Sequence, residues 1–514
     1  MLGLHADIEF LILDHIYEIK DLKALCLTSK SCHERVIPRF YRHVNIQLWN
    51  RTALLFYQQY HAGTRGYLEH TRTLVIEHQE ISNPLNGYAP EDDDKPDEDA
   101  IKEAEDLRMV TFMAILQLFP RDVLRDFRSI ESLSITADLY QPSSEEVHQY
   151  LWAATDWLHL GSSDNVTPQL KALCLCGFDM ELPWLPALRK FVNFERLVRL
   201  QITKCYAASK FFADLGADAE IKELRLKHLA VDSLNQGWGE TEDLPIDKSM
   251  ELVLRKCRKL ESLHVGWYEH WSEEREENLI QTILDHIYRD GKSLRILGVH
   301  PHNNTDDEEN VDSLGVNLER ICRACPNLQQ LGYQLAFGAL DDLNRESDKS
   351  LDEFVHNIAQ LRDLRTLHLR FPHELQSSGC DPYSYDREEI ESYLNDVAES
   401  LRLIASEIFL KLDKFSAETK LQHRLDTIVI GHFTTLRQPT SKCSLPQHCF
   451  VKSETMGESD ESPSERSSHT GLNDRVFRAN PISRSMLRRS RSHLEILEID
   501  IGVEPFEQWA GRVL

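Results

Sequence analysis

The chain contains 514 residues, and its 84 acidic and 58 basic side chains give a formal charge of −26. This charge argues against a nucleic acid partner, because phosphates would be repelled, and no pattern of interleaved basic and aromatic residues appears. No apolar run reaches the roughly 18 residues that cross a membrane, so we expect no membrane partner either.

Cysteine usage and the first residues bear on the compartment. The 11 cysteines are odd in number and follow no disulfide framework, which is typical of a reducing compartment. Asp7, Glu9 and Asp14 stand where a secretory signal would have a basic start. We therefore expect the protein in the cytoplasm, the nucleus or both.

Residues 4–44 are predicted to form a small unit of three helices. Ile8, Ile12 and Ile16 recur every four residues, as on one face of a helix. A unit of this size cannot bury much apolar surface by itself, so it must also pack on the rest of the chain or on a partner. The sequence does not divide these aliphatic side chains between the two roles.

Turn and capping signals set the limits of the second and third helices. Asp21 is the predicted N-cap of the second helix. Residues 28–31 separate that helix from a third one near residues 32–37, and Pro38 is expected to end the third helix.

Beyond this unit, one short pattern recurs eleven times: a large aliphatic residue, two others, a second aliphatic residue, one other and a third. The copies are Thr71-Leu74-Ile76, Ile130-Leu133-Ile135, Leu170-Leu173-Leu175, Leu197-Leu200-Ile202, Ile221-Leu224-Leu226, Leu260-Leu263-Val265, Leu294-Leu297-Val299, Leu328-Leu331-Tyr333, Leu364-Leu367-Leu369, Leu425-Ile428-Ile430 and Leu494-Leu497-Ile499. This spacing is the strand segment of a leucine-rich repeat, in which one unit cannot bury its own apolar face and neighbours must stack.

The intervals between repeats predict helices on the opposite side of the strands. Intervals of 34 to 39 residues have room for a full helix, and residues 314–324 and 351–361 show apolar residues three and four apart. The expected fold is therefore an α/β solenoid with parallel strands on the concave face and helices on the convex face.

Two stretches of biased composition are predicted to be insertions. Residues 91–106 hold ten acids against two lysines and form the core of an acidic insert at about 86–106. Residues 436–492 mix Ser, Pro, Glu and Arg, and they are predicted to be a low-complexity Ser/Arg-rich insert before the last repeat at 493–514.

No motif of a catalytic or metal site stands out. The chain has no nucleophile elbow, phosphate loop or zinc-protease pattern, so we expect no enzymatic activity and no cofactor. Cys322 and Cys325 form a lone C-x-x-C pair on a predicted helix, and small residues buried in that helix are favoured over zinc. Cys443, His448 and Cys449 are also not expected to bind a metal.

The strand residues that alternate with the buried aliphatics are expected to point from the concave face toward a ligand. Those predicted to contact a target are Arg199, Arg225, Lys227, His264, His300, His368 and Arg370, with glycines between them at 266, 298 and 332. Such a basic strip in an acidic chain predicts a target with an acidic or phosphorylated segment. The alternative is an ordinary hydrated sheet surface.

The N-terminal segment resembles the F-box, and the whole chain resembles a fungal F-box/leucine-rich-repeat protein. The matching residues are Leu4, Asp7, Ile8, Ile12, Leu13, Ile16, Asp21, Leu22, Leu25, Leu27, Ser29 and Lys30, followed by the closing segment Phe40-Tyr41-Arg42-His43-Val44. The resemblance implies a helical F-box at 1–45 and a repeat solenoid at 46–435.

The resemblance also implies a function. F-box proteins are substrate receptors of Skp–cullin–F-box ubiquitin ligases, which catalyse nothing themselves and hold a target near a distant active site. The adaptor-binding residues that it implies are Leu4, Ile8, Ile12, Leu13, Ile16, Leu22 and Leu25. The expected partners are the Skp adaptor, through it cullin, and a target protein.

Two alternatives remain open. The chain could be a repeat scaffold that binds the adaptor without a ligase role. Alternatively, the N-terminal helices could be only a cap on the solenoid, although caps do not normally carry an open aliphatic stripe.

Overall fold

The computed structural model describes about half of the chain. The described segments are residues 19–47, 64–77, 129–136, 169–176, 192–203, 208–232, 246–268, 273–302, 312–334, 349–370, 387–431, 448–453 and 479–483, with a few single residues between them. The chain divides into two compact units, which we describe separately. The N-terminal unit comprises residues 1–226, 235–244 and 503–514, and the C-terminal unit comprises residues 227–234 and 245–502.

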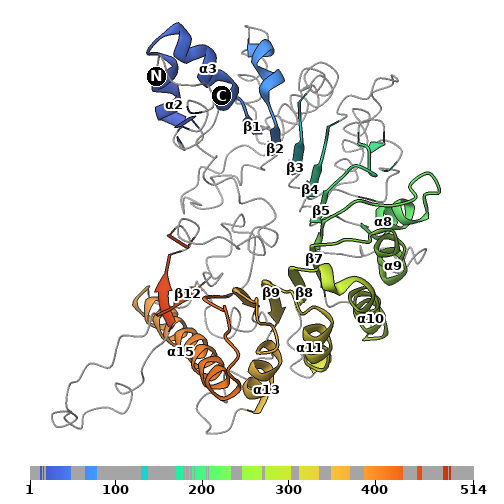
Figure 1. The fold of residues 1–514 in the computed structure, drawn as a ribbon, viewed down its shortest axis with the longest axis vertical. Helices are drawn as coiled ribbons and strands as arrows, with labels where there is room; N and C mark the ends of the chain where they lie inside the picture. Colours follow the sequence, from blue (N-terminus) through green and yellow to red (C-terminus); the bar gives the residue numbers. More distant parts are fainter. Residues whose placement is uncertain are drawn as a thin grey trace, which may run out of the picture. The chain divides into compact units, whose positions relative to one another are not determined.

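The N-terminal unit begins with helices and continues as a parallel sheet (Figure 1). Its elements are α2 (Ile19–Cys26), α3 (Lys30–Phe40), β1 (His43–Gln47), the 3-10 helix η1 (Thr64–His70), β2 (Thr73–Glu77), β3 (Ser132–Thr136), β4 (Ala172–Cys176), β5 (Arg199–Thr203) and α8 (Ala208–Ala217). Strands β1 to β5 pair in chain order, each parallel to the next. The middle aliphatic residues of the repeats lie in register, as Leu74, Leu133, Leu173 and Leu200 show.

Two of the helix limits predicted for the N-terminal segment are wrong. Asp21 is not an N-cap but lies in the first turn of α2, where its carboxylate complements the helix dipole. Ser29 caps α3, because its hydroxyl accepts a hydrogen bond from the Cys32 amide at 3.1 Å. Pro38 lies inside α3, so it does not end the helix as predicted.

The C-terminal unit alternates strands and helices. Its elements are β6 (His228–Asp232), α9 (Ile246–Lys256), β7 (Ser262–Tyr268), α10 (Glu273–Asp290), the 3-10 turn η5 (Gly291–Ser293), β8 (Ile296–His302), α11 (Asp312–Ala324), β9 (Gln330–Gln334), α13 (Lys349–Ile358), β10 (Thr366–Arg370), α15 (Arg387–Thr419), β11 (Thr427–Ile430), β12 (His448–Lys452) and β13 (Ala479–Ile482). Strands β6 to β11 pair in chain order and are parallel. The helices follow one another along one side of these strands (Figure 1).

The predicted helices at 314–324 and 351–361 correspond to α11 and α13. Each helix buries apolar residues three and four apart, such as Leu318, Ile321 and Cys322 in α11. Leu263, Leu297, Leu331 and Leu367 are fully or almost fully buried on the strands beneath the helices. The packing of helices on one sheet face therefore follows from the helical spacing of apolar residues in α11 and α13 and from their alternation along the strands.

The fifth repeat lies in a different register from the prediction. The string Ile221-Leu224-Leu226 overlaps a second one, Leu226-Leu229-Val231, and the structure places the strand on the second. Leu229 and Val231 pair with Leu263 and Val265 of β7. The prediction was wrong because Leu224 and Leu226 are buried as well, so periodicity alone favours neither string.

The predicted insert at 436–492 contains two strands of the sheet. Strand β12 pairs antiparallel with β11, placing Phe450 beside Ile428, and β13 pairs antiparallel with β12. The sheet therefore continues beyond the parallel repeats, and the predicted boundary at 435 does not mark its end. The copy at 494–499 lies outside the described residues.

The observed fold is thus α/β, with a mostly parallel sheet whose strands follow chain order in each unit. Across the described segments, no helix is both long enough and apolar enough to span a membrane.

Candidate functional site

The N-terminal helices share a small apolar core. Leu13, Leu22 and Val36 are buried against one another, and Ile16, Leu25, Cys26 and Phe40 pack around them half-buried. Two of the predicted adaptor-binding residues, Leu13 and Leu22, are therefore buried in the core of the N-terminal helices.

Other aliphatic side chains of the same segment face solvent. Ile8 is 47% exposed, Ile12 is 39% exposed and Leu27 is 80% exposed. We call these three residues the apolar stripe. Ile8 and Ile12 belong to the predicted adaptor-binding set, Leu27 does not, and Leu4 lies outside the described residues. Because exposed large aliphatics on so small a unit cost free energy, they mark a surface available to a partner.

Helix α3 is tied to the first strands by hydrogen bonds and ring contacts. The Thr71 hydroxyl donates to the carbonyl of Tyr41 at 3.0 Å, and the Arg72 amide donates to the carbonyl of Arg42 at 2.8 Å. The rings of Tyr41 and Tyr67 lie 5.3 Å apart. The predicted boundary at residue 45 falls inside β1, so the helices and the first strand form one continuous structure.

The seven residues of the predicted target-binding strip have different environments. Arg199 begins β5 and is exposed in the N-terminal unit. Arg225 and Lys227 precede β6 instead of lying on a strand, which corrects their predicted position. His300 and Arg370 lie on β8 and β10, but their side chains fall outside the described part of the structure.

The two remaining residues of the strip, His264 and His368, lie on the predicted strands but have no exposed surface. They belong to the strand face that alternates with the helix-facing leucines, which we call the inner face. Its other positions on β7 to β11 are also buried, namely Ser262, Ile296, Gln330, Thr366, Thr427 and Val429. At these described positions the inner face of the C-terminal unit is therefore closed, and the role predicted for His264 and His368 stays a prediction.

A residue that follows β13 covers part of this inner face. Leu487 is fully buried in a cluster with Ile296 of β8, Val429 of β11 and Cys449 of β12, and Val451 and Ile482 pack against it. The turn that carries Leu487 is held by a hydrogen bond from its amide to the Ser483 carbonyl at 2.9 Å. Sequence reasoning assigned this segment to the low-complexity insert. The only local signal was the short apolar run Cys449-Phe450-Val451.

Lys227 is engaged within the C-terminal unit. Its Nζ donates to Oε1 of Glu261 at 2.6 Å, and this contact lowers the pKa of the Glu261 carboxyl, with a smaller contribution from Arg295. A cation already paired with a carboxylate is a weaker anchor for an acidic target than the sequence suggested.

The C-x-x-C pair is buried at the C-terminal end of α11. Cys322 and Cys325 are both free thiols with little or no exposed surface, and burial raises the pKa of each to about 12. Both thiols are therefore protonated at neutral pH, which is unfavourable for metal binding. Among the described residues, no group of three or more His, Cys, Asp or Glu side chains is placed to hold a metal ion.

Comparison with known proteins adds no identification. No protein-family model matches the chain, and no curated protein matches it significantly.

Proposed function

We propose that this protein is the substrate-recognition subunit of a Skp–cullin–F-box ubiquitin ligase. In this proposal the N-terminal helices dock the Skp adaptor, and the leucine-rich-repeat solenoid holds a target protein. The chain contributes no catalytic group. It raises the concentration of the target at the ubiquitin-loaded enzyme of the complex.

The observation that carries the proposal is the division of aliphatic residues in the N-terminal helices. Leu13 and Leu22 are buried in the internal core, whereas Ile8, Ile12 and Leu27 of the apolar stripe remain exposed. A helix pair that served only as a cap would turn a polar outer face to solvent. Exposed aliphatic side chains in a helical segment that is tied to the sheet suit a docking surface for another helical protein.

The test is co-purification of the full chain with a Skp adaptor. The Ile8→Asp/Ile12→Asp variant places two charges in the apolar stripe without touching the buried core, so it should lose the adaptor. The matched control is Leu410→Asp on α15, because Leu410 is 44% exposed and belongs to the C-terminal unit. This control should bind the adaptor as the wild type does.

Two results would contradict the proposal. Wild-type protein that captures no adaptor rules out the F-box role. Adaptor capture that survives Ile8→Asp/Ile12→Asp places the interface elsewhere. A circular dichroism spectrum equal to that of the wild type shows that the variant is folded.

A scaffold without a ligase role is the second candidate, and the closed inner face favours it. Buried His264 and His368 leave no open surface for a target at the described inner-face positions of β7 to β11. Cullin is the discriminating partner. Adaptor and cullin recovered together support the receptor, and adaptor recovered without cullin supports the scaffold.

A further inference from the structure

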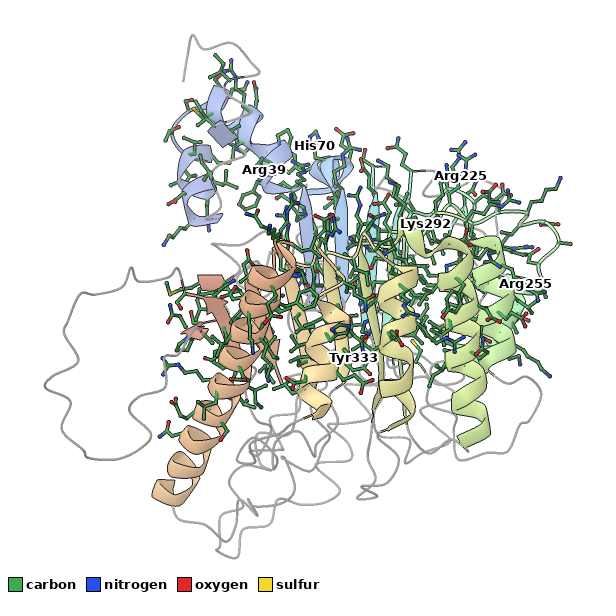
Figure 2. All side chains as sticks on the ribbon, turned by 60° about the horizontal axis from the view of Figure 1, so that its bottom comes forward. Arg39, His70, Arg225, Arg255, Lys292 and Tyr333 are labelled. Atoms are coloured by element: carbon green, nitrogen blue, oxygen red, sulfur yellow. The ribbon has the colours of Figure 1, made fainter. Side chains whose placement is uncertain are left out.

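A group of exposed cations lies where the helices of the C-terminal unit lead into the strands. Arg258 and Lys259 precede β7, Lys292 and Arg295 precede β8, and Arg362 precedes β10. All five side chains are exposed. We call these five residues the basic edge, and Figure 2 shows Lys292 near the end of the helical layer.

The turns that carry the basic edge are locked side by side. The Arg295 amide donates to the Glu261 carbonyl at 2.8 Å, the Gln329 amide to the Arg295 carbonyl at 2.7 Å, and the Arg365 amide to the Gln329 carbonyl at 2.7 Å. Side chains add to this ladder, because Ser293 Oγ donates to the Leu260 carbonyl at 2.7 Å. The edge is therefore preorganised, which lowers the entropy lost on binding.

The two acids on these turns each form an ion pair with a cation outside the edge. Glu261 accepts from Lys227, and Asp363 lies 2.9 Å from Arg424. In the part of the chain that the structure describes, the side chains of Arg258, Lys259 and Lys292 make no ion pair. Such unpaired, clustered cations are unexpected in a chain with 84 acidic and 58 basic residues.

Helix dipoles do not account for the whole group. Cations at a helix C-terminus are stabilised by the dipole within the last turn. That role is filled by Arg255 and Lys256 on α9, Arg289 on α10 and Arg323 on α11. The basic edge lies beyond these helix ends, so its clustering points to a ligand.

The composition of the four turns favours a polypeptide over a nucleic acid. Residues 257–261, 291–295, 325–329 and 361–365 hold no aromatic residue, so bases have no surface on which to stack. Glu261 and Asp363 interrupt the row of cations. They would repel the continuous phosphate backbone of a nucleic acid, whereas the separate carboxylates of an acidic peptide can bind between them. From β7 to β10, three strand spacings make about 14 Å, the length of about four residues of extended chain.

We propose that the basic edge is a docking surface for a short Asp/Glu-rich segment of a partner protein. Arg258, Lys259 and Lys292 bind carboxylates at one end, and Arg362 binds one at the other end. This site lies on the turns and not on the closed inner face, and it does not depend on the ligase role. Adaptor binding and acidic-segment binding can each fail alone.

The experiment measures fluorescence anisotropy of a labelled ten-residue Asp/Glu peptide with the full chain at low salt. The test variant is Lys259→Glu/Lys292→Glu. The control is Lys248→Glu/Lys414→Glu, which changes the net charge equally at exposed sites on α9 and α15. We expect the test variant to bind about tenfold more weakly and the control to bind as the wild type does. Salt should weaken binding by the wild type.

Three outcomes would overturn the proposal. A matched Asn/Gln peptide that binds as tightly shows that charge is not recognised. An equal loss in the control shows that net charge, and not the edge, governs binding. A thymidine oligonucleotide that binds more tightly than the acidic peptide, through the same lysines, assigns the edge to nucleic acid.

Discussion

Leu487 and Ile296 lie in one buried cluster, although β8 and the turn after β13 are far apart in the sequence. Ile296 begins β8 on the inner face, and Leu487 has no exposed surface. The C-terminal part of the chain thus helps to close the face that the repeats were expected to offer to a target.

Leu487→Ala should destabilise the C-terminal unit by about 2–5 kcal/mol, because a fully buried leucine leaves a cavity. Chemical denaturation measures the effect, and hydrogen exchange should become faster in β8 and β11. Met486→Ala is the control, since Met486 is 60% exposed, and its effect should stay within about 0.5 kcal/mol. Equal stability of Leu487→Ala and the wild type would mean that the cover contributes nothing.

Gly291→Ala should also destabilise the protein. An added Cβ would lie 3.0 Å from the Ala324 carbonyl oxygen and 3.0 Å from Cys325 Sγ. Because the first of these atoms is backbone, relief requires a shift of α11 against η5, and we expect a cost of about 1–3 kcal/mol. The control is Gly66→Ala in η1, where nothing lies within 4 Å of the added Cβ. Its thermal midpoint should be unchanged or slightly higher.

Lys420→Gly should raise stability. Lys420 follows the end of α15 with a φ of 59°, a left-handed conformation that costs free energy for a residue with a Cβ. The expected gain in the free energy of unfolding is about 0.5–1 kcal/mol. Lys414→Gly, inside the same helix, should lower it by a similar amount. Urea denaturation of both variants checks the opposite signs.

His286 should make the protein less stable in acid. Burial lowers the pKa of His286 to about 4, and Arg289 contributes to the shift by donating to Nδ1 at 3.0 Å. The unfolded chain therefore binds a proton between pH 6.5 and 4 that the folded chain does not. Stability is full above pH 6.5 and falls as the pH drops toward 4, at about 1.4 kcal/mol per pH unit for this one group.

The variant His286→Gln removes this titrating side chain. The denaturation midpoint should therefore depend less steeply on pH between pH 6.5 and 4. His423 and His448 also have pKa values lowered mainly by burial, so a smaller slope should remain. A slope identical to that of the wild type would show that His286 does not titrate differently in the two states.

Local periodicity determined many of the elements of this protein. The spacing of aliphatic residues predicted β2 to β5 and β7 to β11, and the apolar pattern predicted α11 and α13. The prediction succeeds because side chains alternate between the two faces of a strand and recur every three to four residues on one face of a helix. For β6 the interval between repeats favours the second string, which places Leu229 34 residues before Leu263, the same interval that separates Leu263 from Leu297.

Only the tertiary structure decided what lies against each face. In the N-terminal helices, Leu13 and Ile12 are adjacent in the chain, yet one is buried and the other exposed. On the inner face, His264 and His368 have the pattern of ligand-facing residues, but the face is closed, and Leu487 supplies part of its cover. Periodicity shows on which face of a strand or helix a side chain lies. Its burial depends on contacts with residues that are distant in the sequence.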